Sequence, residues 1–128
     1  MKRQIFFTQG EEGCYADYEV IDNCLVIKLK RDLDHHCAQF VKERSDQLID
    51  KRNIRHIIFD FERTTFMDSS GIGVIMGRYK RVSVSGGRIA VTHLNTAVDR
   101  IFRLSGLFKI AKLYSDNQSA MEEFKRLG

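Results

Sequence analysis

A largely apolar segment in the middle of the chain, residues 54–61, constrains the fold more than any other feature of the sequence. Its centre reads Ile57-Ile58-Phe59, and its length suits a strand better than a helix. A strand without regular polar alternation is covered on both faces, as in a parallel sheet flanked by helices. The segment therefore predicts an α/β architecture.

Patterns typical of strands and helices alternate over the rest of the chain. Two segments around the turn pair Asp22-Asn23 read as a hairpin, while Asn95 or Thr96 is placed to begin a helix that Gly106 ends. Strands that alternate with helices imply right-handed crossovers and a mostly parallel sheet, to which the hairpin adds an antiparallel pair. We expect a single mixed sheet of about five strands with four helices, with strands at 15–21, 25–29, 54–61, 88–91 and 111–114 and helices at 37–50, 70–85, 96–104 and 117–127.

Length and charge restrict the class of protein. With 128 residues, 43% of them apolar, the chain is large enough for one domain with its own core. No apolar run approaches the ~20 residues of a membrane span. The apolar stretch near the start of the chain is also too short for a signal peptide. We therefore expect a soluble, cytoplasmic protein. The net charge of +4 would suit nucleic acid, but the basic residues form no stripe with stacking aromatics, so no direct nucleic-acid binding is expected.

The cysteines and histidines do not form a metal site. Cys14, Cys24 and Cys37 are odd in number and lack Cys-x-x-Cys spacing, so we expect small buried hydrophobic residues rather than disulfides or zinc ligands. In Asp34-His35-His36, neighbouring side chains point apart, so the imidazoles cannot easily share one ion. We interpret Asp34 as the cap of the following helix, and expect no metal and no cofactor.

The candidate site follows the central strand. A polar link leads to Asp68-Ser69-Ser70-Gly71, which opens a helical pattern. Asp and Ser side chains satisfy the free N–H groups of a first helical turn, and a hydroxyl there lies beside N–H dipoles that favour an anion. This chemistry fits a phosphorylation site or a simple helix cap, and it allows either serine.

The glycines at positions 71, 73 and 77 suggest a dinucleotide-binding loop, but that interpretation fails. It needs an acidic residue after the next strand, where this chain has Thr92-His93, and Asp68 would face a pyrophosphate. We interpret the glycines as allowing the helix to lie close to the sheet.

A serine hydrolase is equally unsupported. The motif Gly-x-Ser-x-Gly is absent, because Met67 and Asp68 stand two residues before the two serines. None of the four histidines is placed by a motif as a general base. No catalytic residue is therefore expected.

Residues 67–80, Met-Asp-Ser-Ser-Gly-Ile-Gly-Val-Ile-Met-Gly-Arg-Tyr-Lys, resemble the phosphoacceptor segment of the anti-sigma factor antagonists. These are the single-domain members of the STAS group (sulphate transporter and anti-sigma antagonist). Segments 33–36, 54–58 and 105–110 agree in the same order, and the resemblance is stronger to the sporulation sigma-F branch than to the stress-response or transporter branches. It covers residues 18–128 as a STAS domain and leaves 1–17 as an N-terminal extension.

The resemblance implies a partner-switching regulator of transcription. The unphosphorylated form would bind an anti-sigma factor that is also a serine kinase, and so release a sigma factor. That kinase would phosphorylate Ser69 using ATP, the complex would dissociate, and a PP2C-like serine phosphatase would reset the switch. The N–H groups of Ser70, Gly71 and Ile72 are expected to be free to hold the phosphate. The choice of Ser69 over Ser70 comes from the resemblance.

The resemblance also places the loop at 31–34 beside the phosphoacceptor loop on the partner-binding face. We therefore expect partner contacts from a set of residues in these two loops: Asp32, Asp34, Asp68, Ser69, Ser70 and Gly71. The family commonly has Gly-Glu where this chain has Arg31-Asp32, which predicts an altered affinity for the partner. The alternative is a STAS scaffold or nucleotide-sensing domain without phospho-switching, but scaffold versions need no hydroxyl at the serine pair.

Overall fold

The computed structural model describes residues 2–6 and 10–127, and its centre is one six-stranded sheet in the order β1-β2-β3-β4-β5-β6. Neighbours β1, β2 and β3 pair antiparallel, whereas β3, β4, β5 and β6 pair parallel. The mixed, mostly parallel sheet is thus confirmed. Its strands are β1 (Arg3–Phe6), β2 (Ala16–Ile21), β3 (Cys24–Leu29), β4 (His56–Asp60), β5 (Ile89–Thr92) and β6 (Ala111–Tyr114).

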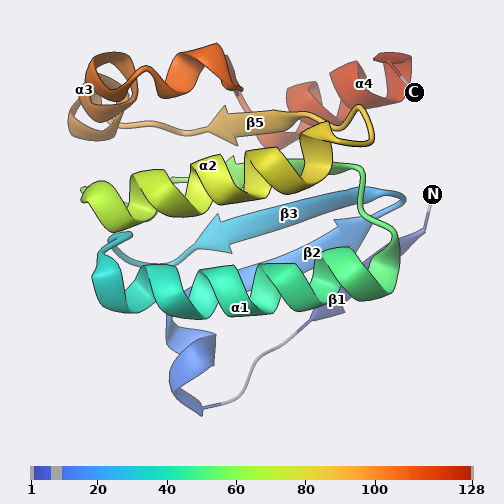
Figure 1. Ribbon diagram of the computed structural model, residues 1–128, viewed down its shortest axis with the longest axis horizontal. Coiled ribbons are helices and arrows are strands. Elements are labelled where there is room, and N and C mark those ends of the chain that lie inside the picture. Colours follow the sequence, from blue (N-terminus) through green and yellow to red (C-terminus); the bar gives the residue numbers. More distant parts are fainter. Residues whose placement is uncertain (1, 7–9, 128) are drawn as a thin grey trace.

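Three helices cover one face of the sheet and the fourth covers the other. The first group comprises α1 (His35–Arg52), α2 (Ser69–Ser83) and α3 (Thr96–Ser105), with α4 (Asn117–Leu127) opposite. Each parallel crossover is right-handed and steps to the next strand in the same direction, so the three connecting helices fall on one face. Figure 1 shows α1 and α2 side by side across that face. Short 3₁₀ turns, η1 (Gly10–Cys14) and η2 (Leu107–Lys109), complete the chain.

Two hydrophobic clusters fill the spaces between these layers. The larger lies between the sheet and α1–α3, where side chains such as Ile27, Phe59 and Phe102 are fully buried. The smaller lies under α4, whose Met121 and Phe124 pack with residues of β3, β4 and β5. All five residues of β4 are buried, because helices cover both of its faces. This explains the apolar segment that first indicated the fold.

Some boundaries differ from expectation. The sheet has a sixth strand, β1, which pairs with β2 from Arg3↔Ile21 to Phe6↔Tyr18. Strand β1 lies within residues 1–17, which were expected to be an extension. Its four residues are mostly exposed, so no apolar pattern in the sequence predicted this strand. Helix α2 begins at Ser69 instead of Ser70. Cys14 is exposed, which corrects the expectation of burial, while Cys24 and Cys37 are buried. Among the described residues, no helix has both the length and the apolarity to span a bilayer.

Candidate functional site

Three loops meet at the carboxyl ends of the parallel strands. They are residues 30–34 after β3, 61–68 after β4 and 93–95 after β5. The carboxyl ends of neighbouring parallel strands lie at one edge of a sheet, where α/β proteins commonly place their sites. We call this region the loop edge. The sequence-predicted residues between Asp32 and Gly71 gather here.

Asp32 holds the loop that precedes α2. One carboxylate oxygen, Oδ1, accepts hydrogen bonds from the Thr65 N–H (2.9 Å), the Thr65 hydroxyl (2.9 Å) and the Phe66 N–H (3.1 Å). Partial burial raises the pKa of Asp32, but these donors outweigh it and hold the pKa below its ordinary value. Asp32 therefore braces the 61–68 loop from the neighbouring 30–34 loop.

Backbone pairing adds a second link between the same two loops. Leu33 and Met67 form a parallel bridge, in which the Leu33 N–H donates to the Phe66 carbonyl at 3.1 Å. The Thr64 hydroxyl donates to the Arg31 carbonyl at 3.0 Å. The 61–68 loop is thus held along most of its length by the 30–34 loop.

Asn95 ties in the third loop. Its side-chain amide donates to the carbonyls of Thr64 (3.2 Å) and Thr65 (3.3 Å). Its oxygen accepts the Val98 N–H at 2.8 Å, which confirms the predicted cap of α3. The sequence indicated the capping role but not the clamp, because nothing local shows which carbonyls lie within reach of the amide.

The first turn of α2 satisfies its own N–H groups. The Asp68 carboxylate accepts the Ser70 N–H at 2.8 Å, and the Asp68 carbonyl lies 3.1 Å from the Gly71 nitrogen and 3.2 Å from the Ile72 nitrogen. The expectation that these three N–H groups are free to hold a phosphate is therefore wrong. Asp68 acts as a cap with both its side chain and its carbonyl.

The two serines differ in their surroundings. Ser69 is exposed, and its hydroxyl makes no hydrogen bond within the described part of the chain. Ser70 is half-buried, and its hydroxyl lies 3.2 Å from Nδ1 of His35, the first residue of α1. Gly71 packs tightly, because a Cβ there would lie 2.8 Å from the Leu33 carbonyl oxygen. Of the two serines, Ser69 is the more exposed, and its hydroxyl is the one without a partner in the described structure.

The contact between Ser70 and His35 was not expected and resembles part of a catalytic dyad. A nucleophilic serine also needs a group that orients the histidine and N–H donors for an oxyanion. Within residues 2–6 and 10–127 His35 makes no hydrogen bond to a carboxylate, and the Ser70 N–H already binds Asp68. The pair therefore anchors the start of α2 to the start of α1.

Asp34 caps α1, as predicted. Its Oδ1 accepts the Cys37 N–H at 2.9 Å, and its own side chain is exposed. The neighbouring His36 packs edge-on against Tyr15 and Phe40, with ring centroids 5.5 Å and 5.3 Å away. Over the described ranges, no three His, Cys, Asp or Glu side chains are grouped to hold a metal ion.

A polar network beneath the loop edge joins it to α4. Buried Asp60 accepts hydrogen bonds from the Glu62 N–H (2.9 Å) and from Asn117 (2.8 Å), and it pairs with His93 Nδ1 at 2.9 Å. Burial raises the pKa of Asp60, but these partners outweigh it and lower the pKa below its ordinary value. The Thr92 hydroxyl donates to Asn117 Oδ1 at 2.6 Å. Sequence reasoning missed this network.

Comparison with known proteins agrees with this geometry. The profile of the STAS domain family matches residues 15–120. The chain belongs to the STAS domain family. It is 41% identical over 101 residues to an anti-sigma F factor antagonist of Paenibacillus polymyxa, covering 79% of this chain and 86% of that protein. The family and fold inferred from the sequence are therefore confirmed.

Two solved structures of the anti-sigma factor antagonist SpoIIAA share the fold of this STAS domain. One, in the unphosphorylated form, is similar with a TM-score of 0.70 and 26% identity over 87% of this chain and 97% of that one. The other, from Bacillus in the phosphorylated form, has a TM-score of 0.69 and 28% identity over 85% and 98% of the two chains. Proteins with this fold thus exist in both states.

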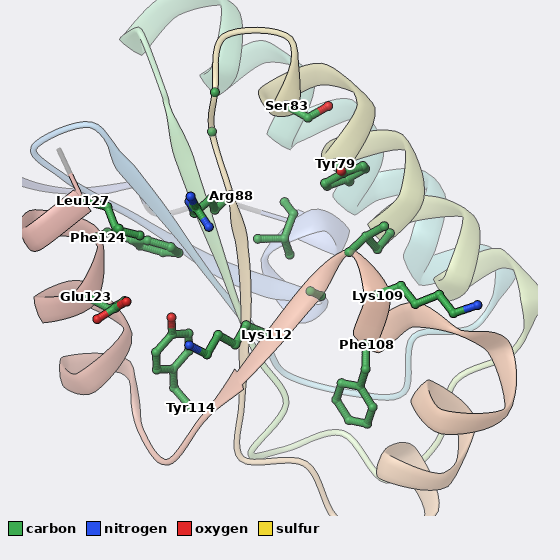
Figure 2. A pocket seen from close by; sticks show the side chains of 15 residues that line it. Tyr79, Ser83, Arg88, Phe108, Lys109, Lys112, Tyr114, Glu123, Phe124 and Leu127 are labelled. Atoms are coloured by element: carbon green, nitrogen blue, oxygen red, sulfur yellow. The ribbon is translucent and has the colours of Figure 1, made fainter.

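A separate hollow of about 390 Å³ lies at the other end of the STAS domain, around the start of β6 (Figure 2). The cations Arg88, Lys109 and Lys112 line it, which suggests anion binding. Figure 2 shows, however, that Lys109 points away from Arg88, and Lys112 extends toward the Tyr114 ring, 5.4 Å from its centroid. The three charges do not converge, so we place the candidate site at the loop edge.

Proposed function

We propose that this STAS domain is an anti-sigma factor antagonist with no catalytic activity of its own. In its unphosphorylated form it binds an anti-sigma factor that is also a serine kinase, and so frees a sigma factor in the cytoplasm. The identity to the Paenibacillus polymyxa antagonist and the likeness to SpoIIAA in both phosphorylation states support this proposal. The sporulation sigma-F branch is favoured for the same reason.

We assign Ser69 as the phosphoacceptor, and one observation carries the assignment. Of the two adjacent hydroxyls, that of Ser69 is exposed at the first residue of α2, while that of Ser70 lies against His35. A kinase must surround the acceptor hydroxyl to place it in line with the γ-phosphate. Asp32, Asn95 and the Leu33–Met67 bridge hold the loop in place, so Ser69 is presented on a rigid support.

The proposed contacts with the kinase lie around Ser69. Asp34, Asp68, Ser70 and Gly71 flank it at the loop edge, and Asp32 acts mainly by bracing the loop on which they meet the partner. Phe66 extends this surface, since the residue is 51% exposed on the same loop. An apolar ring surrounded by polar groups is typical of the centre of a protein interface.

Phosphorylation acts at this interface. A phosphate on Ser69 adds about −1.5 to −2 charges at pH 7 where a closely packed partner surface lies. Burying that charge without a paired cation costs several kcal/mol, which lowers affinity by roughly a thousandfold or more. A PP2C-like serine phosphatase then restores the binding form. This sequence of steps makes Ser69 a switch rather than a catalytic group.

The test uses the purified anti-sigma factor kinase from the same organism, with [γ-³²P]ATP and phosphopeptide mapping. We expect label on Ser69, none on the Ser69→Ala variant, and retained kinase binding by that variant. Ser70→Ala is the matched control and should still be labelled. Label on Ser70, Thr64 or Thr65 with Ser69 clean would overturn the assignment, and absence of any binding would overturn the proposed function.

A further inference from the structure

Two glycines in the middle of α2 are not required by the packing of this chain. Beyond its chain neighbours and its own helix backbone, a Cβ at Gly73 or Gly77 would meet no atom of the described residues within 4 Å, unlike one at Gly71. Glycine in a helix interior destabilises the helix relative to alanine. The two lie four residues apart and therefore on one face of the helix. Their absence of side chains leaves space on the outside of the molecule.

That space is a groove between α1 and α2 with a volume of about 320 Å³. Facing stripes of the two helices line it, and the lining on α2 is mostly small. The lining residues on α1 are His35, Ala38, Gln39 and Lys42. Those on α2 are Ser70, Gly73, Val74, Gly77 and Arg78. The stretch from Ser70 to Arg78 spans about 12 Å, roughly two turns of a helix.

The two ends of the groove have different chemistry. At one end Ser70 and His35 close it, directly beside the exposed Ser69. At the other end Arg78 is buried, with its side chain 4% exposed and its Nε without a partner in the described structure. The groove therefore begins next to Ser69.

The Arg78 end carries more positive than negative charge. Asp46 is shared by Arg78 (3.0 Å), Arg81 (3.0 Å) and Lys42 (3.3 Å), and Arg81 also pairs with Asp50. Three cations thus face two carboxylates, which favours an approaching acidic group. The same excess, on a chain with a net charge of +4, disfavours a second copy of this protein.

We propose that the groove between α1 and α2 receives an α-helix of the anti-sigma factor kinase, with small apolar side chains over Gly73 and Gly77 and a carboxylate near Arg78 and Lys42. The inference rests on the proposed function and extends its interface away from Ser69. Glycines let two helices approach closely, and an apolar helix face in a groove is a common mode of recognition. The partner helix compensates for the stability that the two glycines cost the free protein.

The test measures affinity of the unphosphorylated full chain for the purified kinase. Gly77→Leu fills the groove, so we expect at least about a tenfold loss of affinity with an unchanged or higher melting temperature. Lys80→Leu, an exposed position on α2 outside the groove, is the matched control and should bind within about twofold. Equal binding by wild type and Gly77→Leu would overturn the proposed role of the groove, and the proposed function would be unaffected. Equal losses in Gly77→Leu and Lys80→Leu would also overturn it.

Two further variants keep the test decisive. If Gly77→Leu misfolds, Gly77→Ala adds one methyl group with open space around it in the described structure, and we expect it to melt higher yet bind roughly threefold more weakly. Lys42→Glu should slow association and reduce its salt dependence. Undiminished binding by Gly77→Ala and by Lys42→Glu would overturn the proposal. A wild-type chain that does not bind the kinase at all would remove the proposed function and this inference together.

Discussion

Strand β4 carries a buried ionisable side chain at each end, and the two ends accommodate burial in opposite ways. His56, at the amino end, stacks on Phe124 of α4 with ring centroids 4.3 Å apart. Its Nδ1 accepts the Arg88 N–H at 3.1 Å, while its Nε2 has no partner in the described structure. Asp60, at the carboxyl end, is surrounded by donors from Glu62, His93 and Asn117.

The pKa values follow from these surroundings. Burial, with Arg55 and Arg88 nearby, lowers the pKa of His56 to about 4, so the imidazole is neutral at pH 7. Asp60 stays charged because its donors outweigh burial. The carboxyl end, where three loops supply polar groups, can hold charge and carries the candidate site. At the amino end, the buried ionisable side chain is kept neutral.

The largest expected change in stability comes from adding a side chain at one of two glycines, one near each end of β4. A Cβ at Gly87, near the amino end, would lie 1.8 Å from the Arg55 carbonyl oxygen, whereas one at Gly71 would lie 2.8 Å from that of Leu33. Backbone atoms cannot move aside as a flexible side chain does. We expect Gly87→Ala to lower the free energy of unfolding by about 3 kcal/mol or more, and Gly71→Ala by about 1–2 kcal/mol. Urea unfolding measures both, and the reverse order would show that the loop edge is the more tightly packed end.

The dependence of stability on pH also distinguishes the two ends of β4. A buried neutral His56 with a pKa of about 4 stabilises the fold fully above its unfolded pKa of 6.5, and this contribution is lost as pH falls toward 4. The loss is roughly 3 kcal/mol. Asp60 contributes above its unfolded value of 3.8 and loses its contribution only at lower pH. His56→Gln should be less stable at pH 7 and flatten the decline between pH 6.5 and 4 in thermal melts; an unchanged slope would contradict this assignment.

Asp32 tests how firmly the loop edge is braced. Asp32→Ala removes the acceptor of three hydrogen bonds, and because the site is partly solvated we expect a loss of about 2 kcal/mol in the free energy of unfolding. Hydrogen exchange should become faster at Thr65 and Phe66. Asp34→Asn is the control and should change stability little, since Asn caps a helix about as well as Asp. Equal effects of the two substitutions would mean that Asp32 is no more than a cap.

Sequence reasoning found the features that short segments determine. The apolar segment around Ile57-Ile58-Phe59 identified β4, and the caps Asp34 and Asn95 and the stop at Gly106 were read from local chemistry. Burial on two faces and capping each depend on residues a few positions apart. Such features can therefore be predicted without knowledge of the tertiary structure.

The remaining features depend on proximity that the sequence does not show. His35 and Ser70 are 35 positions apart, and Asp60 and Asn117 are 57 apart. These pairs meet only because parallel strands bring helix starts and loop ends to one edge. The open surroundings of Gly77 are likewise a tertiary fact: its sequence position suggested close packing on the sheet, and the structure shows free space.

The smallest expected effect concerns phosphorylation of Ser69 and the stability of the fold. The helix dipole favours the phosphate by about 0.3–1 kcal/mol, but Asp68 already occupies the Ser70 N–H and opposes the new charge. Since Ser69 is exposed, solvent screens that repulsion, and the two contributions nearly cancel. We expect the phosphorylated and unmodified forms to melt within a few degrees of each other, a difference of about 1 kcal/mol or less. Amide shifts should be confined to the 61–68 loop, the first turns of α2 and the start of α1. Shifts that reach His56 and the amino end of β4 would mean that the signal travels through the fold, and that the two ends of this strand are coupled rather than separate.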